Sequence, residues 1–134
     1  MTLKALFPYA AATRGVTVRA AVSYMADQSD TRNGRWLWAY HIRVENGGPV
    51  AIQLVSRHWE ITDGYGALHI VDGEGVVGEQ PVIAPGDSFD YVSACPLATS
   101  TGSMEGSFQM ICADGMLFDA LIPAFALTAP VVRQ

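Results

Sequence analysis

The stretch Arg35-Trp-Leu-Trp-Ala-Tyr-His-Ile-Arg-Val-Glu-Asn46 decides the fold class of this chain. Aromatic and β-branched residues occupy every second position from Trp36 to Val44, and mostly small or polar residues lie between them. A period of two is typical of a half-buried β-strand. The sequence Asn46-Gly-Gly-Pro49 ends the pattern, because glycine and proline favour turns. We therefore predict an extended strand over residues 35–46.

The same alternation continues on both sides of this strand, and no helical period interrupts it. It begins at Gly15 and recurs after each cluster of turn-forming residues. We predict one all-β domain over residues 15–127, an antiparallel β-sandwich of seven to eight strands. Residues 1–14 show no period and are predicted to be a flexible N-terminal arm, and residues 128–134 a C-terminal tail.

The composition argues against several classes of function. The 134 residues carry a formal net charge of −5, whereas nucleic-acid binding needs clustered Lys and Arg. No apolar run approaches about 18 residues, so we expect no membrane insertion. The two cysteines, Cys95 and Cys112, are too few for a disulfide framework and fit a reducing cytoplasm. A hydrophobic fraction of 50% is compatible with a homodimer.

A glycine motif, Gly73-x-Gly75-x-x-Gly78, matches the dinucleotide-binding fingerprint in spacing. That fingerprint works because a helix begins at the third glycine, and no helical period follows here. Three carboxylates flank the glycines and would repel a phosphate: Asp72, Glu74 and Glu79. We interpret the motif as a turn that uses glycine at positive φ. Anion binding stays open as an alternative, provided that Arg57 or Arg43 reaches the loop from another strand.

The most unusual predicted strand contains Arg57-His58-Trp59. By alternation, one face carries Val55, Arg57, Trp59 and Ile61, and the other carries Leu54, Ser56, His58 and Glu60. Neither face is wholly polar. The strand fits the middle of a sandwich, with the stem of Arg57 covering an aromatic ring. It equally fits an exposed Arg–His–Trp surface for protein recognition.

Neither a metal site nor a catalytic constellation is predicted. The three histidines are His41, His58 and His69, and none has the spacing of a metal-ligand pair. No Gly-x-Ser-x-Gly nucleophile elbow occurs, and the acidic residues are dispersed singly. We therefore expect no catalytic residues, no bound metal and no cofactor, and we classify the chain as a non-enzyme.

Several longer motifs resemble the ApaG domain family, in the family's order and across residues 15–127. The matching pieces are Tyr40-His-Ile-Arg-Val-Glu-Asn46, Gln53-Leu-x-Ser-Arg-His-Trp-x-Ile-x-Asp63, Val71-x-Gly-x-Gly-Val-Val-Gly-Glu-Gln-Pro81, Pro85-Gly-x-x-Phe-x-Tyr-x-Ser93, Pro96-Leu97-x-Thr99 and Gly102-x-Met104-x-Gly106. One departure is Ser100, where the family often has proline. The resemblance implies an immunoglobulin-like sandwich of the fibronectin type III kind.

The resemblance also implies a function. Bacterial stand-alone members of the family are associated with cobalt resistance and magnesium efflux, and eukaryotic members look like binding modules. We therefore expect a cytoplasmic, non-enzymatic module that binds an unknown protein partner, through a surface of Arg57, His58, Trp59, Glu74 and Glu79. The family's glycine motif is likened to a pyrophosphate-binding one. The alternative is thus a small-ligand binder that takes pyrophosphate or a nucleotide at loop 73–78, with Gly73, Gly75, Gly78 and Arg57 as ligand-binding residues.

Overall fold

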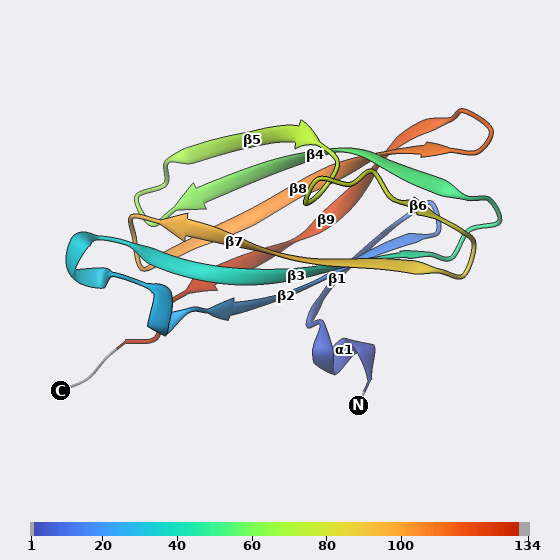
Figure 1. The fold of residues 1–134 in the computed structure, drawn as a ribbon. Helices are drawn as coiled ribbons and strands as arrows, with labels where there is room; N and C mark the ends of the chain where they lie inside the picture. The colour runs from blue at the N-terminus through green and yellow to red at the C-terminus, as the bar shows by residue number, and fades with distance from the viewer. Residues whose placement is uncertain (1, 132–134) are drawn as a thin grey trace.

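The computed structural model describes residues 2–131 and consists of two antiparallel β-sheets packed face to face (Figure 1). One sheet has the strand order β1-β2-β3-β7; the other has the order β5-β4-β8-β9, with the short β6 paired to β4. The strands are β1 (Tyr9–Thr13), β2 (Val16–Tyr24), β3 (Trp36–Asn46), β4 (Ile52–Asp63), β5 (Leu68–Glu74), β6 (Val82–Ile83), β7 (Ser88–Leu97), β8 (Thr101–Cys112) and β9 (Leu117–Thr128). The predicted β-sandwich is confirmed, and the described residues form nine strands rather than seven to eight.

The alternation of β3 builds half of the core. Trp38, Ile42 and Val44 point between the sheets and are buried, as the sequence predicts. They meet buried residues of the opposite sheet, among them Phe108 of β8 and Leu127 of β9. Burying one such side chain contributes roughly 1.5–3 kcal/mol, so this face of β3 anchors the fold.

The N-terminal segment departs from its prediction. A flexible arm over residues 1–14 is wrong for residues 9–13, which pair with residues 16–20 as strand β1. Phe7 is also buried, and its ring packs against the His41 ring in a T-shaped arrangement with centroids 4.8 Å apart. Three consecutive alanines in β1 hide the period of two. At the other end β9 runs to Thr128, and residues 132–134 of the predicted tail lie outside the described residues.

Helical structure is slight in the described part of the chain. It consists of α1 (Leu3–Leu6) and two 3-10 turns, Ala26–Gln28 and Thr31–Asn33, between β2 and β3. None of these segments has the length and apolar character needed to cross a membrane.

The two sides of the sandwich differ. Along β1 and β9 the sheets meet, and the Leu121 N–H donates to Thr13 Oγ1 at 3.1 Å. On the opposite side β5 and β7 are edge strands, and within residues 2–131 each pairs along its length with one neighbour only. The interior of the sandwich therefore opens between β5 and β7.

Candidate functional site

A bulge in β4 decides where its polar residues point. The register between β4 and β8 shifts between Leu54 and Ser56, so buried Leu54 shares the inner face with Arg57 and Trp59. His58 lies on the outer face. The predicted grouping of Leu54 with His58 is wrong, because the bulge inserts one residue and reverses the alternation.

Arg57 lies on the inner face, against the glycine motif. It is opposite Gly73 in the β4–β5 register, and its Nη1 donates to the main-chain oxygens of Glu74 at 3.0 Å and Gly75 at 2.9 Å. A Cβ atom at position 73 would stand 2.7 Å from the guanidinium carbon. Glycine at that position therefore lets the guanidinium approach the strand closely. The structure brings three of the four predicted ligand-binding residues together.

The glycine loop itself is folded inward. The N–H of Gly75 donates to the carbonyl of Val55 at 2.8 Å, and Val76 and Glu79 exchange two main-chain hydrogen bonds of 2.8 and 2.9 Å. Gly75 and Gly78 have φ of 59° and 81°, in the left-handed region that favours glycine. These three N–H groups are already satisfied within the protein. The loop is thus a closed turn, with the side chains of Glu74 and Glu79 exposed.

His58 belongs to a different surface from Arg57. On the outer face of β4 its Nδ1 lies 2.6 Å from Asp72 Oδ1, and its Nε2 lies 3.6 Å from Glu60 Oε2. Trp59 is only 2% exposed, with its ring against Tyr40 and Phe125. The predicted Arg57–His58–Trp59 surface is therefore wrong as a unit, since adjacent strand residues face opposite sides of the sheet.

The ion pair with Asp72 gives a first prediction. The hydrogen bond that the His58 ring donates to the Asp72 carboxylate, more than the nearby charges, raises the pKa of His58 above its ordinary value. In a ¹H–¹³C titration of the histidine rings, Asp72→Asn is expected to bring the His58 pKa down toward about 6.5. A raised histidine pKa stabilises the fold below about pH 6.5, and the gain is lost as pH rises through the folded-state pKa.

The matched control is Glu74→Gln, which removes a nearby carboxylate that does not bond to His58. It should leave the His58 pKa nearly unchanged. Equal effects of the two substitutions would mean that the general acidity of β5, rather than the Asp72 contact, sets the pKa.

A cleft of about 550 Å³ opens between the edge strands β5 and β7. Its inner wall is formed by Tyr40, Trp59 and Met104, and Arg57 also lines it. The remaining lining comes from Ile61, Asp63, His69, Val71 and residues 93–98. Burial raises the pKa of Tyr40, and it raises the pKa of the Cys95 thiol to about 11, so both groups are uncharged near neutral pH. The cleft is mainly apolar, with one cationic side chain at its wall.

Two buried donors have no acceptor in the described part of the chain, and one of them belongs to Trp59, which lines this cleft. Trp59 Nε1 and the Tyr91 hydroxyl are buried and make no hydrogen bond within residues 2–131. By contrast, Trp38 Nε1 donates to the carbonyl of Thr128 at 3.3 Å. An unsatisfied buried donor costs about 1–3 kcal/mol, and such groups are uncommon in folded proteins.

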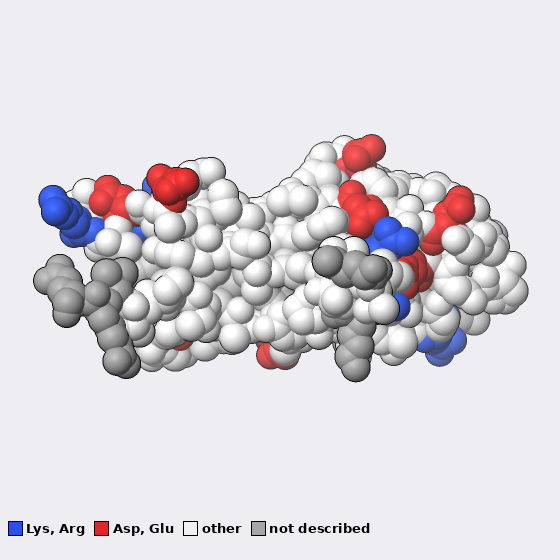
Figure 2. Space-filling model, turned by 90° about the horizontal axis from the view of Figure 1, so that it is seen from below, with Lys and Arg blue, Asp and Glu red and all other residues white. Residues whose placement is uncertain are grey.

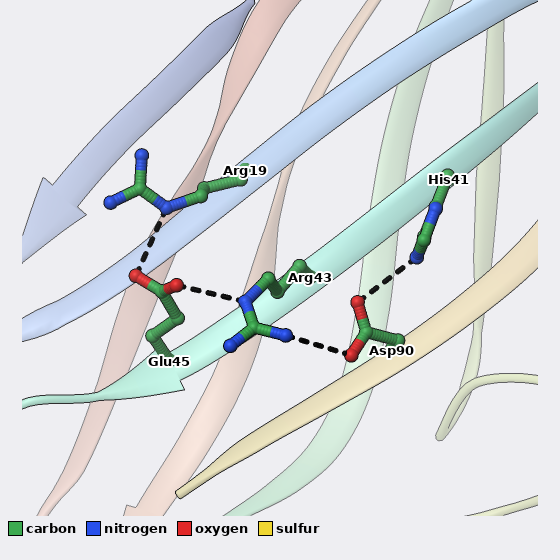
Figure 3. Close-up of polar contacts among 5 residues, drawn as sticks. All are labelled: Arg19, His41, Arg43, Glu45 and Asp90. Atoms are coloured by element: carbon green, nitrogen blue, oxygen red, sulfur yellow. Dashed lines mark hydrogen bonds and ion pairs between the residues drawn. The ribbon is translucent and has the colours of Figure 1, made fainter. Parts of the chain in front are cut away.

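A chain of ion pairs crosses the outer face of the other sheet (Figure 3). It runs from Arg19 to Glu45 (3.0 Å), from Glu45 to Arg43 (2.8 Å), from Arg43 to Asp90 (3.1 Å) and from Asp90 to His41 (2.9 Å). Burial alone would raise the pKa of Glu45, but the hydrogen bonds from the two arginines outweigh it and lower that pKa. Figure 2 shows the molecule from this side, with most of the visible charged side chains toward its two ends and few between them. No group of three or more His, Cys, Asp or Glu side chains over the described range is placed to hold a metal ion.

Two features of this region cannot be seen in the sequence alone. Asp72 bonds to His58 across strands, and a contact of that kind becomes visible only once the strand register is known. The cleft combines residues of five strands, because Tyr40, Trp59, Val71, Cys95 and Met104 come from β3, β4, β5, β7 and β8. The one part of the cleft that the sequence does indicate is the pair Arg57 and Trp59, because residues two apart in a strand share a face.

Comparisons with known proteins agree with the fold and the motifs. The family model described as the ApaG domain matches residues 26–112. Protein ApaG of Afipia carboxidovorans is 48% identical over 126 residues, which cover 94% of this chain and 97% of that protein. Protein ApaG of Caulobacter vibrioides is 46% identical over 122 residues, with coverages of 91% and 87%.

Solved structures give the same result. The crystal structure described as the ApaA protein of Bordetella pertussis has a TM-score of 0.83 at 40% identity, and the match covers 87% of this chain and 95% of that one. The C-terminal domain of wzt has a TM-score of 0.54 at 11% identity, covering 93% of this chain and 79% of that one. That second likeness concerns the fold alone.

Proposed function

The chain belongs to the ApaG domain family, and on this premise we propose that it is a non-enzymatic, cytoplasmic binding module that contacts a protein partner. Bacterial stand-alone members of the family are associated with cobalt resistance and magnesium efflux. In this proposal the association is indirect, and the bound partner carries it.

The observation that carries the proposal is the exposed apolar edge strand β5. Leu68 is 55% exposed and Ile70 is 49% exposed, both on the outer face of the strand, and Tyr65 is exposed in the turn before it. The other side of β5 has no paired strand within residues 2–131. Soluble proteins usually protect such edges, because unpaired main-chain groups beside apolar side chains attract another strand. A partner that adds a strand to β5 would use both features.

The test replaces the apolar side chain at the centre of this edge. We expect Ile70→Lys to weaken binding of the partner at least tenfold, because a charge would have to be buried at the contact. The measurement is affinity capture from a cell extract, followed by titration of the purified partner. Sedimentation of the pure protein shows whether the partner is a second copy of this chain, since Ile70→Lys would then leave a monomer.

Leu121→Lys is the control, since Leu121 is 57% exposed on β9, at the far edge of the same sheet. It should bind the partner within about twofold of the unaltered protein. If both variants retain the same proteins with the same affinity, β5 is not the contact surface.

The alternative function, a binder of pyrophosphate or a nucleotide at loop 73–78, is favoured by the position of Arg57 against Gly73. The N–H groups of Gly75, Val76 and Glu79 weigh against it, because they already donate to main-chain carbonyls of the protein. A pyrophosphate titration followed by amide chemical shifts distinguishes the two. Saturable shifts confined to residues 72–81 would favour the ligand binder over the protein-binding module.

A further inference from the structure

Arg57 is a cation inside the sandwich without a carboxylate partner. Arg19 and Arg43 each form an ion pair with Glu45, whereas Arg57 forms none in the part of the chain that the structure describes. It is partly buried on the inner face of β4, where it lines the cleft. Removing a guanidinium from water without a counter-charge is unfavourable. The position of Arg57 therefore favours an anionic ligand.

Arg57 and its neighbour Trp59 both carry donor groups that have no acceptor within residues 2–131. Among residues 2–131, the hydrogen bonds of Arg57 all come from Nη1, which leaves the Nε and Nη2 protons for a ligand. Trp59, on the same face of β4, also lines the cleft, and its Nε1 is unsatisfied. A ligand that accepts several hydrogen bonds at once would give these donors the acceptors that they lack.

Among residues 2–131, the carboxylate in the lining of the cleft is that of Asp63, and both of its oxygens are held by groups of its own turn and strand. Asp63 Oδ1 accepts from the N–H groups of Tyr65 at 2.9 Å and Ala67 at 3.0 Å. Its Oδ2 lies 3.3 Å from His69 Nε2.

The rest of the cleft is apolar, which narrows the class of ligand. Aromatic and aliphatic side chains form its walls, including Tyr40, Ile61, Val71 and Met104. Its volume of about 550 Å³ lies within the ~300–1,000 Å³ typical of small-molecule sites. Pyrophosphate would bring several charges and no apolar surface, so it would leave these walls unused. A ligand with one negative charge and an apolar group would match both the guanidinium of Arg57 and the apolar walls of the cleft.

We propose that the cleft between β5 and β7 binds a carboxylate carried on an apolar group, with Arg57 and Trp59 Nε1 as its donors. The carboxylate belongs to a free aliphatic or aromatic acid, or to the C terminus of a peptide that ends in an apolar residue. This ligand occupies the inner face of the sandwich. Its β5 contacts, His69 and Val71, face inward, whereas Leu68 and Ile70 of the proposed partner surface face outward, and the free edge of β5 borders both.

The indole N–H resonance of Trp59 gives a direct test. The ¹⁵N-labelled protein is titrated with phenylacetate, with hexanoate, and with a short peptide ending in leucine, each to about 10 mM, ten times the Kd of a ~1 mM ligand. The matched controls are phenylacetamide, hexanamide and the peptide with an amidated C terminus. We expect the acids to shift the Trp59 resonance saturably and the amides to bind at least tenfold more weakly. The Trp38 indole, already bonded to Thr128, should stay in place.

Variants assign the donors. Arg57→Gln is expected to weaken acid binding at least tenfold. Arg57→Lys is expected to weaken it less, since lysine keeps the positive charge but cannot donate two parallel hydrogen bonds to the carboxylate. Trp59→Phe keeps an aromatic ring and is expected to weaken binding a few-fold. Arg32→Gln, in the exposed turn before β3, removes a distant positive charge and should leave binding unchanged.

The outcomes decide the proposal and the source of the ligand. Selective binding of phenylacetate or hexanoate supports a free acid, and selective binding of the unamidated peptide supports a peptide C terminus. The proposal is overturned if neither kind of acid shifts the Trp59 resonance, if amides bind as well as acids, or if Arg57→Gln binds acids undiminished. A failure here leaves the β5 proposal intact, since Ile70→Lys tests that surface separately.

Discussion

Replacing Asn46 with alanine is expected to lower the free energy of unfolding by about 3 kcal/mol. The side chain is 2% exposed at the end of β3, and its Nδ2 donates to the carbonyls of Val50 at 2.8 Å and Ile83 at 2.9 Å. Its Oδ1 accepts from the N–H of Gly48 at 3.0 Å. Alanine leaves all three main-chain groups without this partner, and the Ile83 contact is fully buried. Urea unfolding monitored by tryptophan fluorescence measures the loss.

Two further variants isolate the cause. Asn33→Ala also removes one amide hydrogen bond, to Asp30 at 2.7 Å, but this bond is exposed, so we expect a loss below about 0.5 kcal/mol. Asn46→Asp keeps the acceptor for Gly48 and replaces the donor with a carboxylate that faces two carbonyl oxygens. It should destabilise the protein at least as much as alanine near neutral pH. An Asn46→Ala loss as small as that of Asn33→Ala would show that water replaces the amide.

The fold could be predicted from the sequence wherever one residue type alternates with another. Trp38, Ile42 and Val44 identify the inner face of β3 without any structural information. The Tyr9–Thr13 segment escaped prediction because alanine contributes almost no contrast between the faces of a strand. Tertiary pairing with β2, rather than local pattern, makes these residues a strand.

The candidate site could be predicted less completely, because it depends on register and on a bulge. The sequence places Arg57 and Trp59 on one face, and both do line the cleft. It gives no sign that Leu54 shares this inner face of β4, because the extra residue of the bulge leaves no mark in the hydrophobic pattern. The pairing of Arg57 with Gly73 follows from the β4–β5 register, which in turn depends on the length of the 64–67 turn.

Gly75→Ala is expected to destabilise the protein by about 3 kcal/mol. Its φ of 59° lies in the left-handed region, which costs an alanine about 1–2 kcal/mol. A Cβ atom at position 75 would also overlap the carbonyl oxygen of Glu79, which accepts the hydrogen bond of Val76 at 2.8 Å. Because that oxygen belongs to the main chain, the turn must open to make room. Opening it would also disturb the carbonyls that hold Arg57.

Gly78→Ala separates the steric part of this effect from the conformational part. Gly78 has a φ of 81°, but a Cβ atom there would have no neighbour within 4 Å, so we expect a loss of only about 1 kcal/mol. The two variants are compared by urea unfolding, and the Trp59 indole resonance reports on the neighbourhood of Arg57. A motif that cradled a phosphate would need a side-chain-free surface at both glycines. A closed turn needs it only at Gly75, so equal losses at the two positions would contradict the packing described for this loop.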